Sequence, residues 1–301
     1  MSSIFQARCT LRKLILGLLL TLGASAFASN LLGPAGLRSK EAVLETQLAQ
    51  NPFGRQLVLQ SQEAARRAEG DIYAVLAHPF PSVSSALSDP GQWCDILILH
   101  LNNKYCRSGQ EAGAARIELR VGKKREEPIR SAALLSFEWR TAAIEADYFA
   151  IEMSAPNGPM DTSGYAMVVE AIPLDSTRTL LHLGYAFSFG GTGRLAMNIY
   201  LRSVGRDKVG FTRLPGRDHS AGDAAYVQGM RGVVERNTMR YFLAIESYLA
   251  SLRVPPQQQL DYRLATWFDA TEKYARQLRE VEREEYLRMK HNEVRRQKEL
   301  Q

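Results

Sequence analysis

Apolar and polar residues alternate along the middle of the chain. Ile117, Leu119 and Val121 alternate with charged residues, and the stretches 135–140 and 148–153 repeat this pattern. A period of two is typical of strands with one buried face. Further β-rich stretches are 165–172, 179–189 and 209–211. No helical stretch separates the main strands, so we expect an antiparallel sheet connected by hairpins.

Apolar residues at helical spacing flank this sheet on both sides in the sequence. A loose strand pair, 57–59 and 72–76, follows the first helix. The longest helix has a continuous apolar face, and Pro255 ends it. An increasingly charged tail, 282–301, follows the last helix and is expected to fray into solvent. The predicted helices are 39–50, 80–89, 91–99, 195–201, 230–252 and 264–281.

The first 28 residues have the pattern of a secretory signal. Basic residues precede an apolar run over 14–22, and small residues lead to Ala28 and Ser29, the expected cleavage point. The run is shorter than the roughly 20 residues that a membrane span needs, so no integral anchor is expected after cleavage. Cys9 precedes the run, which argues against a lipid anchor. The pattern predicts an exported protein, periplasmic or secreted.

Cleavage would also change the charge and the cysteine content. The segment holds three cationic residues and no acidic one, so the formal charge falls from +6 to +3. An excess this small does not predict a nucleic-acid partner. Cys94 and Cys106 remain, and an oxidising compartment favours a disulfide between them. Two buried thiols are the alternative.

The order of these elements resembles a known superfamily. A strand, two short helices, antiparallel strands and one long helix is the order of the helix-grip fold, found in the START-like (polyketide cyclase and lipid-transfer) superfamily. The likeness covers about residues 71–252 and is greatest to a secreted proteobacterial branch. The segments that carry it are Asp71–Pro79, Val83–Cys94 with Asp89, Pro90 and Trp93, and Glu235–Leu243.

The resemblance implies an α+β fold in which a curved antiparallel sheet grips the long helix. The helix-grip domain would span residues 71–254. Residues 29–70 would add a helix and strand in front of it, and residues 255–301 would add an amphipathic, charged helix behind it.

The superfamily likeness also implies an interior cavity for an apolar or amphipathic molecule. If the long helix lies directly on the sheet, the inward side chains are plain core; if it stands off, they line a pocket. Both arrangements stay open from the sequence. The side chains that would line the pocket are Trp93, Phe137, Trp139, Phe149, Met153, Leu183, Tyr185 and Phe187.

Polar candidates are fewer. His100, Asn102 and Lys104 gather beside the expected disulfide and could bind a ligand head group, although capping and turns use the same residue types. His182 has the opposite strand parity to Leu183 and is expected to face away from it. The histidines and cysteines lack metal-ligand spacing, so we expect neither a metal site nor a cofactor.

The first functional hypothesis is therefore a non-enzymatic binding or carrier protein for an apolar or amphipathic, lipid-like molecule. It is favoured because the sequence contains no convincing catalytic set. The alternatives are a cyclase-like or hydrolytic enzyme that uses the same cavity, and a module that binds an envelope protein through the charged C-terminal helix.

Overall fold

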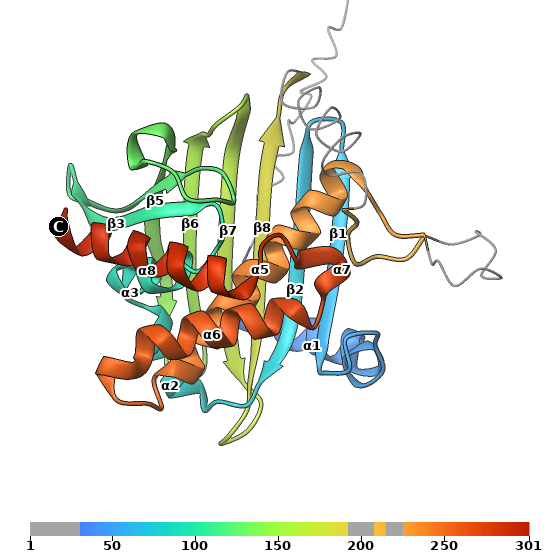
Figure 1. Ribbon diagram of the computed structural model, residues 1–301. Helices are drawn as coiled ribbons and strands as arrows, with labels where there is room; N and C mark the ends of the chain where they lie inside the picture. The colour runs from blue at the N-terminus through green and yellow to red at the C-terminus, as the bar shows by residue number, and fades with distance from the viewer. Residues whose placement is uncertain (1–30, 192–207, 215–224, 301) are drawn as a thin grey trace, which may run out of the picture.

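The computed structural model describes residues 31–191, 208–214 and 225–300. Its fold is α+β, with one large sheet and helices on both faces (Figure 1). The expected signal segment and the predicted helix 195–201 lie outside the described residues. In chain order the helices and strands are α1 (Gly33–Ala49), β1 (Leu57–Ala64), β2 (Arg67–Leu76), α2 (Phe80–Leu87), α3 (Pro90–Leu97), β3 (Asn103–Glu111), β4 (Ala114–Val121), β5 (Ala133–Ile144), β6 (Phe149–Asn157), β7 (Thr162–Pro173), β8 (Thr179–Phe189), α5 (Gly229–Ser251), α6 (Gln259–Glu272), α7 (Ala275–Leu278) and α8 (Arg283–Glu299).

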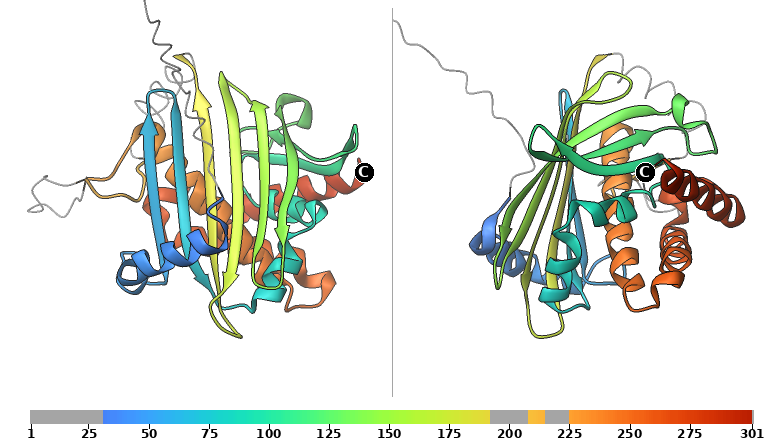
Figure 2. Two further views of the ribbon diagram at one scale, coloured as in Figure 1. Left: turned by 180° about the vertical axis from the view of Figure 1, so that it is seen from behind. Right: turned by 90° about the vertical axis from the view of Figure 1, so that its left-hand side faces the viewer.

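The sheet is antiparallel throughout and contains eight strands in the order β1-β2-β8-β7-β6-β5-β4-β3. It curls over the helices at its β3–β5 side, as the right-hand view of Figure 2 shows. Helices α2 and α3 connect β2 to β3, and α5 follows the last strand. This order and the gripped helix α5 confirm the predicted helix-grip fold.

Helix α5 lies directly against one side of the inner face. Its apolar residues Val234, Phe242 and Ile245 are fully buried in the main core. Gly70 of β2 makes this close approach possible, because a Cβ atom there would lie 2.6 Å from Thr238 Oγ1 on α5. The helix therefore closes the interior along β1, β2 and β8.

Helix α1 covers part of the outer face (Figure 2). Its buried residues Leu37, Leu44 and Leu48 form a second, smaller core with outer-face side chains such as Tyr73 and Ile172. The helix begins earlier than its apolar spacing predicts, at Gly33. Pro34 accounts for this start, since proline fits the first turn of a helix.

The C-terminal helices form a further layer over α5 and the α3–β3 connection (Figure 1). The predicted fraying of the charged tail is wrong: α8 buries Tyr286, whose hydroxyl donates to Leu99 O at 2.9 Å. Within this interface Glu293 binds both Lys104 (3.0 Å) and Lys290 (2.7 Å), and all three side chains have no exposed surface. Burial lowers the pKa of Lys290 to about 8.

Two strand predictions need correction. Residues 103–111 form β3, where the sequence pattern predicted no strand. Residues 209–211 are not a strand; Phe211 N and Thr212 N instead donate to the buried Glu235 carboxylate. β3 is an edge strand paired with the adjacent β4, so its polar composition does not show the alternation of a half-buried strand. At 209–211 the distant Glu235 carboxylate, and not a neighbouring strand, satisfies the backbone.

No helix among the described residues is long and apolar enough to cross a membrane.

Replacing Glu293 with glutamine tests the α8 interface. The change leaves two buried lysines without their shared carboxylate, and breaking a buried pair in this way costs about 3–5 kcal/mol. Urea unfolding should show a loss of this size for Glu293→Gln. Glu284→Gln, at an exposed position of the same helix, is the control, with a change within about 0.5 kcal/mol. Equal stabilities of the two variants would contradict the assigned interface.

Candidate functional site

The structure brings one polar candidate, His100, close to one predicted pocket residue, Tyr185. They meet in a group that we call the tyrosine cluster: Tyr165 of β7, Tyr185 of β8, Tyr241 and Asn237 of α5, and His100 of the α3–β3 connection. The cluster lies between α5 and the inner face of the sheet.

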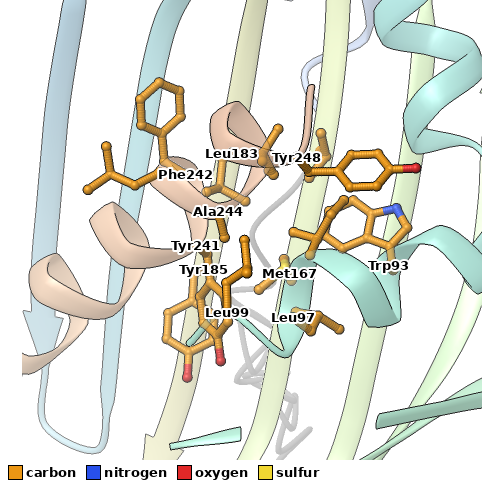
Figure 3. Packing of buried hydrophobic residues seen from close by; sticks show 14 of the residues in the cluster. Trp93, Leu97, Leu99, Met167, Leu183, Tyr185, Tyr241, Phe242, Ala244 and Tyr248 are labelled. Carbon is orange, nitrogen blue, oxygen red and sulfur yellow. The ribbon is translucent and has the colours of Figure 1, made fainter. Parts of the chain in front are cut away.

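Ring contacts link the cluster into a row. The His100 ring stacks on Tyr241 at 4.9 Å, and Tyr241 contacts Tyr185 at 5.3 Å. Tyr165 contacts Tyr185 at 6.4 Å and stacks on Phe187 at 5.7 Å. Tyr185 and Tyr241 lie side by side with their hydroxyls pointing the same way (Figure 3). The row thus carries polar groups through an otherwise apolar interior.

Two rings of this row keep a small residual exposure. Tyr185 and Tyr241 keep 5% and 8% of their surface, whereas Leu183 and Phe242 keep none. Tyr185 stands directly opposite Gly70 in the β2–β8 register, so no side chain of β2 covers it from that position. Trp139, elsewhere in the same core, keeps a similar 7%.

His100 supplies a buried hydrogen-bond donor. Its Nδ1 accepts from Asn102 N at 3.2 Å, so the proton of the neutral ring lies on Nε2. Nε2 is buried and meets no acceptor at hydrogen-bonding geometry. Burial and the positive charges of Arg240 and Lys290 lower the pKa of His100, whereas its interaction with the Asn237 side chain raises it. The lowering effects are larger, so the pKa of His100 lies well below its ordinary value. The ring is therefore neutral at pH 7.

The tyrosines are also neutral. Burial and the neighbouring tyrosine ring raise the pKa of Tyr185 well above its ordinary value, and burial raises the pKa of Tyr241 as well. At pH 7 the cluster consists of uncharged hydroxyls and one uncharged imidazole. Such groups suit the recognition of a neutral oxygen-bearing molecule better than that of a strongly charged one.

Most of the other predicted pocket residues lie elsewhere in the core. Phe149, Met153 and Leu183 are almost completely buried. Trp93 donates from Nε1 to Leu87 O at 2.8 Å and packs edge-on against Trp139 at 5.8 Å. These side chains fill the grip. Two predicted pocket residues border the cluster instead. Phe187 stacks on Tyr165, as described above, and the Phe137 ring lies 6.4 Å from the Tyr165 ring.

The polar candidates separate in the same way. Asn102 donates to Gly122 O at 2.6 Å, and Lys104 lies in the buried α8 interface. Only His100 reaches the tyrosine cluster. The predicted Cys94–Cys106 disulfide is present and ties α3 to β3, which helps to fix the segment carrying His100.

Sequence reasoning did not single out Tyr241, Asn237 and Tyr165 as site residues. Tyr241 and Asn237 belong to the apolar stripe of the long helix, where they are the polar exceptions. Their position as polar side chains within an apolar stripe could have marked them as site residues. The sequence does not show, however, that Tyr241 contacts Tyr185, on a strand far away in the chain.

Two common catalytic arrangements are missing from the described residues. They contain no group of three or more histidine, cysteine, aspartate or glutamate side chains placed to hold a metal ion. Among their hydrogen bonds, no histidine is joined to a serine, threonine or cysteine side chain. A hydroxyl or thiol nucleophile paired with a histidine base is thus missing from these hydrogen bonds.

No protein-family model and no curated protein sequence matches the chain. Solved structures show a weak likeness. A conserved protein from Geobacillus kaustophilus matches with a TM-score of 0.34 and 14% identity, over 60% of this chain and 95% of that chain.

Two named proteins also match. Norcoclaurine synthase from Thalictrum flavum, solved with dopamine and hydroxybenzaldehyde, gives a TM-score of 0.32 and 9% identity, over 48% of this chain and 77% of that chain. The Zhui aromatase/cyclase from Streptomyces sp. R1128 gives 0.30 and 15%, over 68% and 96%. At these TM-scores the likeness says nothing about function. The helix-grip fold of the chain follows from its own strand order and from the position of α5.

Proposed function

We propose that this protein binds an apolar or amphipathic small molecule, lipid-like in character and bearing a hydrogen-bond acceptor oxygen, at the tyrosine cluster. The observation that carries the proposal is the buried His100 Nε2 at the end of an aromatic row: the Asn237 side chain interacts with the ring, but no acceptor meets the Nε2 proton at hydrogen-bonding geometry. Leaving such a donor unsatisfied costs about 1–3 kcal/mol, so a ligand oxygen that accepts from it gains affinity.

The surroundings of His100 support the same ligand chemistry. Aromatic rings provide flat apolar surface, and the Tyr185 and Tyr241 hydroxyls add polar contacts beside it. A binding role is favoured over a catalytic one because these groups are neutral and are not arranged as a nucleophile and its base. The cyclase-like alternative would use the same cluster.

Export remains part of the proposal. The Cys94–Cys106 disulfide supports an oxidising compartment, as does the signal-like pattern of residues 1–28. A contact with an envelope protein would have to use the exposed side of α8, because its other side packs against the α3–β3 connection.

Two fluorescent probes test the acceptor preference directly: a naphthyl ketone and the matching naphthalene without the carbonyl. We expect the wild-type protein to bind the ketone about 3- to 10-fold more tightly, which is the value of one net hydrogen bond. His100→Leu should abolish this preference while keeping the apolar part of the affinity. Tyr262→Phe, at an exposed tyrosine, is the control and should keep the preference.

Native mass spectrometry of the protein purified under mild conditions provides a second readout, since a co-purifying molecule would be seen directly. Absence of saturable binding of either probe, or an unchanged ketone preference in His100→Leu, would contradict the proposed site.

The neutral state of His100 makes a prediction about acid stability. Its folded-state pKa lies below the ordinary value of 6.5, so its contribution is complete above pH 6.5 and is lost as the pH falls below it. The free energy of unfolding should lose up to about 1.4 kcal/mol per pH unit from this group.

Urea unfolding between pH 7 and pH 5 measures this loss. His100→Leu should show a shallower decline than the wild type, and the control His291→Gln, at an exposed histidine, should decline like the wild type. A His100→Leu profile parallel to that of the wild type would show that His100 titrates normally.

A further inference from the structure

A second histidine is held in an unusual setting on the outer face of the sheet. His182 of β8 lies between two carboxylates: Nδ1 is 2.8 Å from Glu170 Oε1 of β7, and Nε2 is 2.9 Å from Asp71 Oδ1 of β2. The imidazole keeps only 2% of its surface exposed. Both ring nitrogens can donate only when the ring is an imidazolium. The prediction that His182 faces away from Leu183 is confirmed.

Glu170 links this histidine to helix α1. The carboxylate has no exposed surface and accepts from Leu32 N (2.9 Å), Gly33 N (3.1 Å) and Tyr148 Oη (2.8 Å). Gly33 has a φ of +72°, a conformation that favours glycine, at the point where the chain enters the helix. The start of α1 is thus anchored on a carboxylate, and a helix N-terminus stabilises such a negative charge.

The other charged and titratable groups around His182 come from three directions. Tyr73 of β2 stacks on the imidazole at 4.5 Å, and Lys40 of α1 stands 5.0 Å from the centre of the Tyr73 ring. Arg38 of α1 pairs with Asp147, at 3.5 Å, next to Tyr148. Glu145 acts on Tyr148 through its charge. None of these groups can replace the positive charge of the imidazolium between Asp71 and Glu170.

If His182 lost a proton, one of its ring nitrogens would carry a lone pair and no hydrogen. That lone pair would then face a carboxylate and could not donate to it. Glu170 would then be a buried anion without a cation beside it, which is strongly unfavourable. Asp71 is partly exposed and can turn to water, but Glu170 is covered by the first turn of α1, so this turn would have to move for water to reach Glu170.

We propose that Asp71, His182 and Glu170 form a pH-sensitive latch that holds α1 on the outer face while His182 is protonated and releases it when His182 is neutral. Release would uncover the apolar side of α1 (Leu37, Leu44 and Leu48) and the sheet surface beneath it. This device is separate from the tyrosine cluster, which lies on the opposite face of the sheet.

The direction of the titration agrees with the geometry. Burial alone would lower the pKa of His182, but the hydrogen bonds and charges of Asp71 and Glu170 outweigh it and raise the pKa above 6.5. The latch is therefore complete below pH 6.5 and weakens as the pH rises through the raised value. Between these two values the opening equilibrium of α1 rises up to tenfold per pH unit.

Hydrogen exchange followed by mass spectrometry, corrected for the intrinsic exchange rate, tests the latch in the full chain. Between pH 6 and pH 9 we expect protection of residues 33–49 to fall several-fold, by up to tenfold for each unit by which the folded-state pKa is raised, while protection of residues 229–251 changes little. Protection of α1 that is independent of pH would overturn the proposal.

Two variants and one control sharpen the test. His182→Gln should remove the pH step and leave α1 weakly protected at every pH. Asp71→Asn, at a side chain that is 31% exposed, should preserve the fold and move the step to lower pH. His291→Gln should behave like the wild type, and a step that persists unchanged in both latch variants would overturn the proposal.

If His182→Gln fails to fold, an NMR titration of the wild-type protein still tests whether protonation of His182 controls α1. The His182 ring and the amides of Leu37 and Leu44 should titrate with the same midpoint. A ring that titrates without any response in α1 would show that the three residues are only a static ion pair.

Discussion

The contact between α5 and β2 is the constraint on which the rest of the structure depends. Because Gly70 has no side chain, Thr238 approaches the strand more closely than any other residue at that position would allow. This contact presses the helix onto β1, β2 and β8 and fills that side of the grip with core. It also leaves Tyr185, directly opposite Gly70, uncovered by any side chain of β2 at that position, and the other rings of the tyrosine cluster lie next to it.

The two faces of the sheet use histidine in opposite ways. On the inner face, burial among cations keeps His100 neutral and leaves Nε2–H as a donor. On the outer face, two carboxylates stabilise the protonated form of His182 strongly enough to outweigh burial. One histidine therefore suits the recognition of a neutral molecule and the other suits the control of a helix. The difference comes from neighbouring charges, since both rings are almost completely buried.

The order of the elements could be predicted from the sequence because strands and helices leave local patterns. Most of the fold could be predicted from the alternation in β4, β5 and β6 and from the apolar stripe of α5. Strand parity predicted correctly which face of the sheet His182 lies on. The site was harder to predict because it depends on distant partners. In the sequence Lys104 looks like a free cation, because its partner Glu293 lies almost two hundred residues later. Tyr241 looks like an ordinary core residue of a helix, because its contacts with Tyr185 and His100 come from other parts of the chain.

The position of a bound molecule is the central claim, and fluorine NMR of 3-fluorotyrosine-labelled protein tests it most directly. When the naphthyl ketone is added, a ligand at the tyrosine cluster should shift the resonances of Tyr165, Tyr185 and Tyr241, each assigned by substitution with phenylalanine. Tyr73 and Tyr148, which pack under α1 on the outer face, should remain unchanged. Shifts confined to Tyr73 and Tyr148, or no saturable shift in any tyrosine, would contradict an interior ligand site.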